Sequence, residues 1–533
     1  MSCKRPLFFC LFLLGLLFAG FLVRYGSDRV GTPQRRCTIK NVVLVSLDTL
    51  RADALGAYGN AGEFTPNLDA LAASGFLFER AYTHAPMTAP AHMSLLTSTL
   101  PYEHKVCNTA TEGCTFPLGN HLVTLAELLQ ARGFETTAFT GGGSVDGRYG
   151  FARGFRAYHD SSADFVAFPG PVLHWLRRAP IQRPFFLFLH TYKTHSPYFP
   201  EPRIRERFCS DHQGQVVVSP HVLHDTLLRL LEEAPDEQAA KEVFWLLADR
   251  VEGLPTREHR ALRALVARGH SPERALEAAA LLREAGMEGR LPRYGDRLYW
   301  SALSHPSQTL TSVRAYRCLY QAEARELDAV VGLLLDTLAE TRRINNTLLV
   351  VLSDHGEEFL DHGGMGHGMT LYEEALRVPL IVKHPCAAEP LRIPQEVGLI
   401  DVAPTILELL GLPLPKGFRG RSLVPLLHGE ALEERAVYAE LAPVGPEVTS
   451  RPRQGCALVL GRRKLVQLDG KKVLFDLASD PTELHNHALQ RPELTQPLAL
   501  LLEPHLLPRE PPAEVPRLPD TLSDQLRQLG YAQ

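Results

Sequence analysis

The sequence predicts an α/β sandwich with a mostly parallel central sheet that is flanked by helices. Two continuous runs of apolar, largely β-branched residues, Asn41–Leu47 and Thr347–Leu352, are typical of strands that are covered on both faces. A third apolar run, Phe185–Leu189, ends directly before His190. Segments with apolar residues at helical spacing separate these runs: Pro66–Ser74, Val123–Ala131 and Leu327–Leu338. Strands that alternate with helices favour a parallel sheet, in which functional groups collect beyond the carboxyl ends of the strands.

The length of the chain sets its domain organisation. Because 533 residues exceed one ordinary core, we expect a large catalytic domain with additions, or two to four smaller domains. We place the catalytic domain at residues 41–430 and a C-terminal subdomain with its tail at residues 431–533. Short strands predict a small sheet in this subdomain: Val437–Leu441, Cys456–Leu460, Lys464–Leu468 and Lys472–Phe475. Helices are predicted to follow at Leu494–Leu506 and Leu522–Leu529.

A helical insertion is predicted inside the catalytic domain, at about residues 219–290. Ser219 and Ser271 each precede a proline, a combination that suits the start of a helix. Apolar residues recur at helical spacing between and after these positions, which indicates three or four helices. The insertion either covers the active site and selects substrates or is a passive addition.

The composition is that of a globular protein, with 45% hydrophobic and 22% charged residues. A formal net charge of -4 gives no general bias toward nucleic acid or anionic lipid. We therefore expect no nucleic-acid partner.

The N-terminus carries the signature of a membrane segment. Lys4 and Arg5 precede an apolar run from Pro6 to Val23, which Arg24 closes. The run is close to the length of about 20 residues that spans a bilayer. We predict a signal-anchor at residues 1–24 and a linker at residues 25–40, and the alternative is a cleaved signal peptide. The flanking charges do not decide the orientation, because arginines follow the run as well.

Nine cysteines are present, without CxxC or Cys/His zinc spacing. Cys107 and Cys114 flank a turn-rich stretch. They either close a small disulfide loop in an oxidising compartment or remain free thiols.

Two polar residues lie where a strand ends or a helix begins. Asp48 follows the first strand directly, where a buried carboxylate needs a cation or strong hydrogen bonds. Thr88 lies before a proline that suits a helix start, so its hydroxyl is placed near the positive end of the helix dipole. Each residue has a plainer interpretation as the N-cap of a helix.

A third polar segment follows the strand at Thr347–Leu352. Asp354 and His355 are adjacent there and can bind one cation through oxygen and nitrogen. His367 lies between two glycines, which is typical of a loop that approaches a ligand closely. Each pair alone is weak evidence, but the set in this order is specific.

The sequence resembles the sulfatase family of the alkaline phosphatase superfamily, whose fold is the predicted sandwich. The segments that carry the resemblance extend from about Asn41 to Asn486: LDTLRADALGAYG, TPNLDALAASG, TAPAHMSLLTS, HSPY, SDHGE, GHGMTLYEEALRVPLIV and LFDLASDPTELHN. These motifs are much more specific for the fold than for the substrate. The resemblance also implies that the catalytic domain lies on the extracytoplasmic side of the membrane.

The resemblance implies roles for individual residues. Asp48, Asp354 and His355 would bind a divalent cation together with Thr88, which occupies the position of the nucleophile. His92 stands where family members have a basic residue on the nucleophile's helix. His195 and His367 would contact the transferred oxyanion, protonate the leaving group, or bind a second metal ion.

The sequence departs from the family pattern at the nucleophile. Formylglycine sulfatases carry Cys or Ser there, whereas a threonine Cβ bears a methyl group and could be oxidised only to a ketone. Thr49 replaces the second carboxylate of the usual Asp-Asp pair, which removes a ligand for a hard cation such as calcium. Thr88 matches superfamily members that transfer phosphoryl groups with zinc or manganese, so these metals are favoured over calcium or magnesium.

We therefore expect a membrane-anchored hydrolase or transferase that cleaves a phosphate or sulfate ester through a covalent intermediate on Thr88, with phosphoester chemistry favoured. One alternative is a sulfatase that works without formylglycine. Another is a non-catalytic, membrane-anchored binding protein.

Overall fold

The computed structural model describes residues 38–505, except 109–116, 161–163, 181, 197, 199, 211–305, 387–388 and 442–454. The predicted anchor at residues 1–24, the insertion at about 219–290 and the helix at 522–529 lie outside the described residues. Within the described ranges, no helix has the length and apolar character that crossing a membrane requires.

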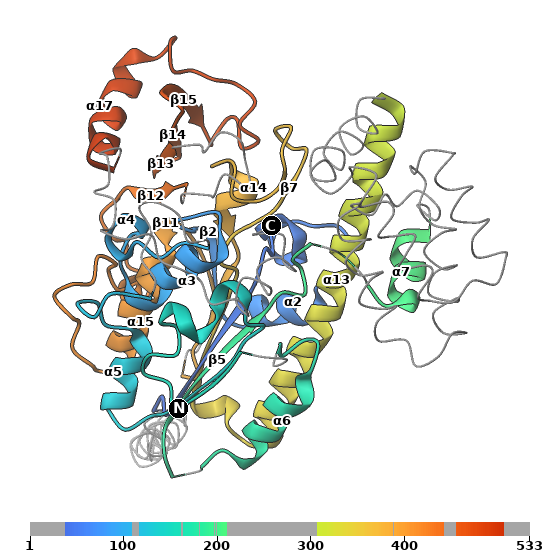
Figure 1. The fold of residues 1–533 in the computed structure, drawn as a ribbon, viewed down its shortest axis with the longest axis vertical. Helices are drawn as coiled ribbons and strands as arrows, with labels where there is room; N and C mark the ends of the chain where they lie inside the picture. Colours follow the sequence, from blue (N-terminus) through green and yellow to red (C-terminus); the bar gives the residue numbers. More distant parts are fainter. Residues whose placement is uncertain are drawn as a thin grey trace, which may run out of the picture. The chain divides into compact units, whose positions relative to one another are not determined.

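The central sheet has nine strands in a mixed arrangement. Three of them, β2, β5 and β11, are labelled in Figure 1. Its main path runs β11-β2-β10-β6-β1-β5-β3-β4, and β9 pairs with β2. The strands are β1 (Asn41–Leu47), β2 (Phe76–Tyr82), β3 (Glu135–Phe139), β4 (Ala157–His159), β5 (Phe185–Thr191), β6 (Thr347–Leu352), β9 (Arg377–Val378), β10 (Leu380–Lys383) and β11 (Leu391–Gly398). β1 is parallel to both β5 and β6, whereas β9 and β10 are antiparallel to their neighbours. The predicted mostly parallel sheet is confirmed, with these two strands as the exceptions.

Helices cover both faces of the sheet because successive strand residues point to opposite sides. Val42 and Leu44 of β1 belong to one apolar core, and Val43 and Val45 belong to the other. The first core includes residues of α3 (Thr88–Thr97), α5 (Leu125–Ala131) and α15 (Val402–Leu409). The second includes residues of α2 (Pro66–Ala73), α6 (Pro169–Arg178), α7 (Pro202–Cys209) and α13 (Pro306–Glu340). The predicted sandwich is therefore observed.

Short elements complete the fold around the ends of the central strands. They are α4 (Pro101–His104), β7 (Glu358–Phe359), β8 (Met365–Gly366), α14 (Glu373–Leu376) and α16 (Val424–Leu427). β7 and β8 form a two-stranded antiparallel ribbon in the segment that follows β6.

The C-terminal subdomain is a four-stranded antiparallel sheet, as predicted. Its strands follow one another in chain order: β12 (Val437–Glu440), β13 (Gly455–Leu460), β14 (Arg463–Leu468) and β15 (Lys471–Asp476). α17 (Pro492–Leu502) packs against it through Leu498 and Leu502.

A disulfide between Cys209 and Cys318 connects α7 to α13 across 109 residues of sequence. No motif or spacing in the sequence indicates this pairing. Cys107 is also disulfide-bonded, so it is not a free thiol, and its candidate partner Cys114 lies outside the described residues.

Candidate metal centre and nucleophile

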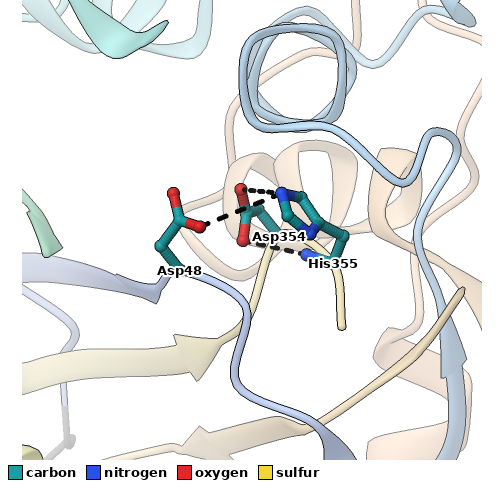
Figure 2. A group of neighbouring side chains, drawn as sticks. All are labelled: Asp48, Asp354 and His355. Atoms are coloured by element: carbon teal, nitrogen blue, oxygen red, sulfur yellow. Dashed lines mark hydrogen bonds and ion pairs between the residues drawn. The ribbon is translucent and has the colours of Figure 1, made fainter. Parts of the chain in front are cut away.

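Two parallel strands bring the predicted metal ligands together. Asp48 follows β1, and Asp354 and His355 follow β6, which pairs with β1 in register up to Ser46 and Leu352. The three side chains point toward one another from these strand ends (Figure 2). One possible ligand atom of each lies within 4.8 Å of the others, and all three residues are buried. The predicted convergence of Asp48, Asp354 and His355 is therefore observed.

Each carboxylate in this cluster has one oxygen held by the protein and one without a hydrogen-bond partner in the described part of the chain. Asp48 Oδ2 lies 3.0 Å from Nε2 of His190, whereas its Oδ1 has no partner among the described residues. Asp354 Oδ1 accepts from the backbone N–H groups of Thr49 and His355, at 3.2 Å and 2.9 Å. Asp354 Oδ2 likewise lacks a partner within the described part of the chain. Buried acceptors are nearly always satisfied, so two such oxygens facing one imidazole fit a cation.

The backbone fixes which nitrogen of His355 faces the two carboxylates. Nδ1 donates to the carbonyl of Gly356 at 2.9 Å, so we assign the proton to Nδ1 and the lone pair to Nε2. Nε2 lies 3.4 Å from Asp354 Oδ2 and 3.9 Å from Asp48 Oδ1. Burial lowers the pKa of His355 to about 3, which keeps the imidazole in the neutral form that binds metals.

Burial and mutual repulsion make two ionised carboxylates costly here. Burial, and then the charge of Asp354, raise the pKa of Asp48 well above its usual range. Burial raises the pKa of Asp354 to about 6. A bound cation would favour the ionised form of both groups.

Thr88 is the first residue of α3, and Met87 before it is the N-cap, with extended backbone angles. The N-cap interpretation of Thr88 is therefore wrong. Thr88 Oγ1 lies 3.3 Å from Nε2 of His355. The Thr88 side chain is also hydrogen-bonded to Asp48, and this bond opposes the rise in the pKa of the Asp48 carboxyl that burial causes. The hydroxyl thus lies beside both candidate ligands, at the amino end of a buried helix.

His92 lies one turn further along α3 and is fully buried. Its Nδ1 donates to the carbonyl of Thr88 at 2.8 Å, and its Nε2 accepts from the Ser46 hydroxyl at 2.8 Å. Burial lowers its pKa, so the ring is neutral. His92 therefore connects the start of α3 to β1 and lies 3.4 Å from Asp354.

His195 and His367 lie side by side above this cluster, with ring centroids 4.9 Å apart. The ring centroid of His367 is also 4.5 Å from that of His355. Burial lowers the pKa of His195 to about 3 and that of His367 to about 4. All seven predicted site residues are thus brought together: His92 contacts Thr88 one turn back on α3, and His195 and His367 lie next to the candidate metal ligand His355.

Three further residues belong to the site by their contacts. His190 holds Asp48, and Glu357 accepts hydrogen bonds from Nδ1 of His367 and from the Tyr198 hydroxyl, both at 2.9 Å. Thr49 adopts a left-handed backbone with φ 57°, which is uncommon for a β-branched residue, and directs its N–H to Asp354. A sequence signal existed for His190, because it directly follows the apolar run Phe185–Leu189, and the structure places it inside β5. Glu357 lies within the SDHGE motif, but nothing in the sequence indicated its partners.

A mixed sheet with buried carboxylates, an imidazole and a hydroxyl at its strand ends is the arrangement of an α/β enzyme with a candidate cation site. The model of the sulfatase family matches residues 40–412. The chain belongs to the sulfatase family. A second model, described as N-sulphoglucosamine sulphohydrolase, C-terminal, matches residues 362–505.

Curated relatives carry sulfatase names. Arylsulfatase K of Mus musculus is 24% identical over 494 residues, which cover 86% of this chain and 78% of that protein. Arylsulfatase K of Homo sapiens is 31% identical over 201 residues, which cover 36% of this chain and 37% of that protein.

Solved structures share the fold. A protein in complex with its substrate D-glucosamine-2-N,6-O-disulfate has a TM-score of 0.64 at 19% identity, covering 88% of this chain and 97% of that one. The phosphonate monoester hydrolase of Agrobacterium radiobacter has a TM-score of 0.61 at 21% identity, covering 88% of this chain and 96% of that one.

Proposed function

We propose that the protein hydrolyses a sulfate or phosphate ester through a covalent ester on Thr88, with a divalent cation held by Asp48, Asp354, His355 and Thr88. The observation that carries the proposal is the position of Thr88 Oγ1, 3.3 Å from His355 Nε2 and hydrogen-bonded to Asp48. The hydroxyl therefore lies beside two of the proposed ligands, and Asp48 and Asp354 each also have one carboxylate oxygen without a partner among the described residues.

In the first step Thr88 Oγ1 loses its proton and attacks the sulfur or phosphorus atom, the bond from that atom to the leaving oxygen breaks, and the leaving oxygen takes up a proton to become an alcohol. Attack by a side chain splits one difficult hydrolysis into two easier steps. In the second step water attacks the threonine ester and releases Thr88 with inorganic sulfate or phosphate. A bound cation would lower the pKa of the Thr88 hydroxyl and offset charge on the transferred group.

His195 and His367 are the proposed groups for the leaving oxygen and the transferred oxyanion. The Glu357 carboxylate accepts from Nδ1 of His367, which orients that ring and favours its protonated form in the reaction. His195 Nδ1 lies 2.6 Å from the carbonyl of Ser196, so the backbone orients the second ring in the same way. His92 is proposed to act through position, because its nitrogens contact Thr88 and Ser46.

The site also favours particular answers for the transferred group, sulfate or phosphate, and for the metal ion. Threonine cannot form the aldehyde of formylglycine, which favours a phosphoester and the direct use of the hydroxyl. The names of the curated relatives favour a sulfate ester, as a sulfatase without formylglycine would cleave. The mixed oxygen and nitrogen ligands favour zinc or manganese over calcium or magnesium.

Paired aryl substrates test the proposal. The zinc-loaded and manganese-loaded protein is assayed with an aryl sulfate, phosphate monoester, phosphodiester and phosphonate, beside Thr88→Ala prepared in the same way. We expect turnover of at least one ester by the native chain and none by the variant. Hydrolysis of the sulfate alone would overturn the phosphoester preference, and no turnover of any ester would leave the binding-protein alternative.

We also propose that the catalytic domain works outside the cytoplasm, attached by the N-terminal segment. The Cys209–Cys318 disulfide supports an oxidising compartment. N-terminal sequencing of the native protein tests the anchor, since a mature chain that begins beyond Gly20 would show cleavage. Removal of residues 1–36 should release a soluble, active enzyme.

A further inference from the structure

A lysine of the C-terminal subdomain is fully buried in a cluster of charges. Lys464 of β14 has no exposed surface. Its Nζ lies 3.1 Å from Oε1 of Glu373 and 2.9 Å from Oε1 of Glu483. These carboxylates raise the pKa of Lys464 against the opposing effect of burial, so the ammonium stays charged. Because a buried charge is costly unless it is paired, the three side chains hold one another in place.

This cluster holds α14 at its first residue. Glu483 Oε2 accepts from the backbone N–H of Glu373 at 2.6 Å, and the Tyr82 hydroxyl donates to Oε2 of Glu373 at 3.3 Å. The backbone of Glu483 has φ 56°, a left-handed conformation that is uncommon for a residue other than glycine. In this conformation the Glu483 carboxylate contacts the N–H of Glu373. Groups outside α14 thus hold both the backbone N–H and the side-chain carboxylate of Glu373.

α14 in turn supports the segment that carries a metal ligand. Its carbonyls at Ala375 and Glu374 accept from the N–H groups of Gly356 and Glu357, at 2.9 Å and 3.1 Å. The contact requires glycine, since a Cβ at Gly356 would lie 1.9 Å from the Glu374 carbonyl oxygen. The Gly356 carbonyl then accepts from His355 Nδ1 and sets the nitrogen that faces the carboxylates.

We propose that Lys464, with Glu373 and Glu483, is a positioning residue for the metal centre. It acts through α14 on the Gly356–Glu357 backbone, and so on the ring of His355 and the carboxylate that holds His367. The inference rests on the proposed metal site. Through this cluster the C-terminal subdomain takes part in catalysis, although the described residues of the subdomain supply none of the proposed metal ligands.

Two variants of the full chain test the proposal. Lys464→Met breaks both ion pairs, and Glu483→Ala removes the acceptor of the Glu373 N–H while leaving the Lys464–Glu373 pair to support folding. Hydrogen exchange at residues 356–357 is measured on the metal-free protein, and Zn²⁺ affinity is measured with a chelator-buffered titration. We expect faster exchange at these amides, a loss of Zn²⁺ affinity of about tenfold or more, and a lower kcat with KM little changed.

Arg153→Met is the matched control, because it breaks the 3.1 Å ion pair with Glu127 and hydrogen bonds to the backbone without a contact to α14. It should lower thermal stability but keep native Zn²⁺ affinity and native exchange at residues 356–357. The proposal would be overturned if folded Lys464→Met and Glu483→Ala kept native Zn²⁺ affinity and native exchange at residues 356–357. It would also be overturned if Arg153→Met lost as much Zn²⁺ affinity as these two variants. If the native chain binds neither Zn²⁺ nor Mn²⁺, the proposed function fails, and the exchange data alone still decide whether the cluster holds this segment.

Discussion

Oε1 of Glu357 lies 2.9 Å from Nδ1 of His367, and both side chains are nearly or fully buried. The second oxygen of the same carboxylate accepts from the Tyr198 hydroxyl. A carboxylate fixed on one imidazole nitrogen orients the ring and stabilises its protonated form. In the proposed mechanism, Glu357 therefore supports His367 during turnover.

Glu357→Gln should therefore lower kcat by about 10–100-fold, the usual effect of losing a supporting carboxylate. The amide keeps the shape and one acceptor but loses the charge that favours protonated His367. Tyr198→Phe is the control, because it removes the other hydrogen bond and leaves the carboxylate charge unchanged. The prediction fails if both variants lose the same fraction of kcat in steady-state assays.

The fold was accessible from sequence because its core strands are unbroken apolar runs. The predicted strands Asn41–Leu47 and Thr347–Leu352 match β1 and β6 residue for residue. The predicted helix at Leu327–Leu338 is only the last part of α13, which begins at Pro306. Charged residues such as Glu323, which pairs with Lys193, interrupt the apolar spacing in the earlier turns. That pairing depends on contacts between distant segments, which spacing does not show.

The candidate site was predictable where the strand ends determine it. Asp48 and Asp354 follow neighbouring parallel strands, so their meeting follows from topology alone. The role of Glu357 depends on the direction of its side chain toward His367, and the role of Lys464 on the packing of two subdomains. The roles of Thr88, His92, His195 and His367 remain predictions until activity is measured.

A metal ion should stabilise the protein through the two oxygens, one of Asp48 and one of Asp354, that lack hydrogen-bond partners among the described residues. At a Zn²⁺ concentration of about 100 times Kd, the free energy of unfolding should rise by about 2.7 kcal/mol. Asp354→Asn and His355→Ala should remain folded, lose most of this increase, and lose turnover. Asp336→Asn, an exposed acid on α13, should keep the full increase in a thermal melt with and without metal. Undiminished activity of either site variant at limiting metal would contradict the assignment.

His84 should make the protein sensitive to acid. Its Nδ1 lies 2.6 Å from the Tyr438 carbonyl and its Nε2 accepts from the Ile400 N–H, so the neutral ring is the one that fits. Burial lowers its pKa from 6.5 to about 4. The unfolded chain therefore binds more protons between those values, and stability falls as the pH falls from 6.5 to 4.

His84→Gln isolates this effect because an amide offers a donor and an acceptor but does not titrate. Relative to the variant, the native chain should lose about 3 kcal/mol of unfolding free energy between pH 7 and pH 4. Urea unfolding at several pH values measures the difference. The prediction would be refuted if the difference in unfolding free energy between the native chain and His84→Gln were constant from pH 7 to pH 4.

The last prediction concerns Thr88, whose hydroxyl contacts both Asp48 and His355. Thr88→Ser keeps the hydroxyl and should retain measurable ester hydrolysis, although loss of the methyl group frees its rotamer. Thr88→Val keeps the branched shape, and Thr88→Asn keeps a polar side chain, but neither has a hydroxyl. Both should fold, bind metal less tightly and lose orders of magnitude in kcat. Because Met87 and not Thr88 is the N-cap, helix stability should differ little among the three variants. Rates are compared at saturating metal, so that weaker metal binding does not count as lost chemistry. If Thr88→Asn turns over substrate as fast as Thr88→Ser, the hydroxyl is not the nucleophile.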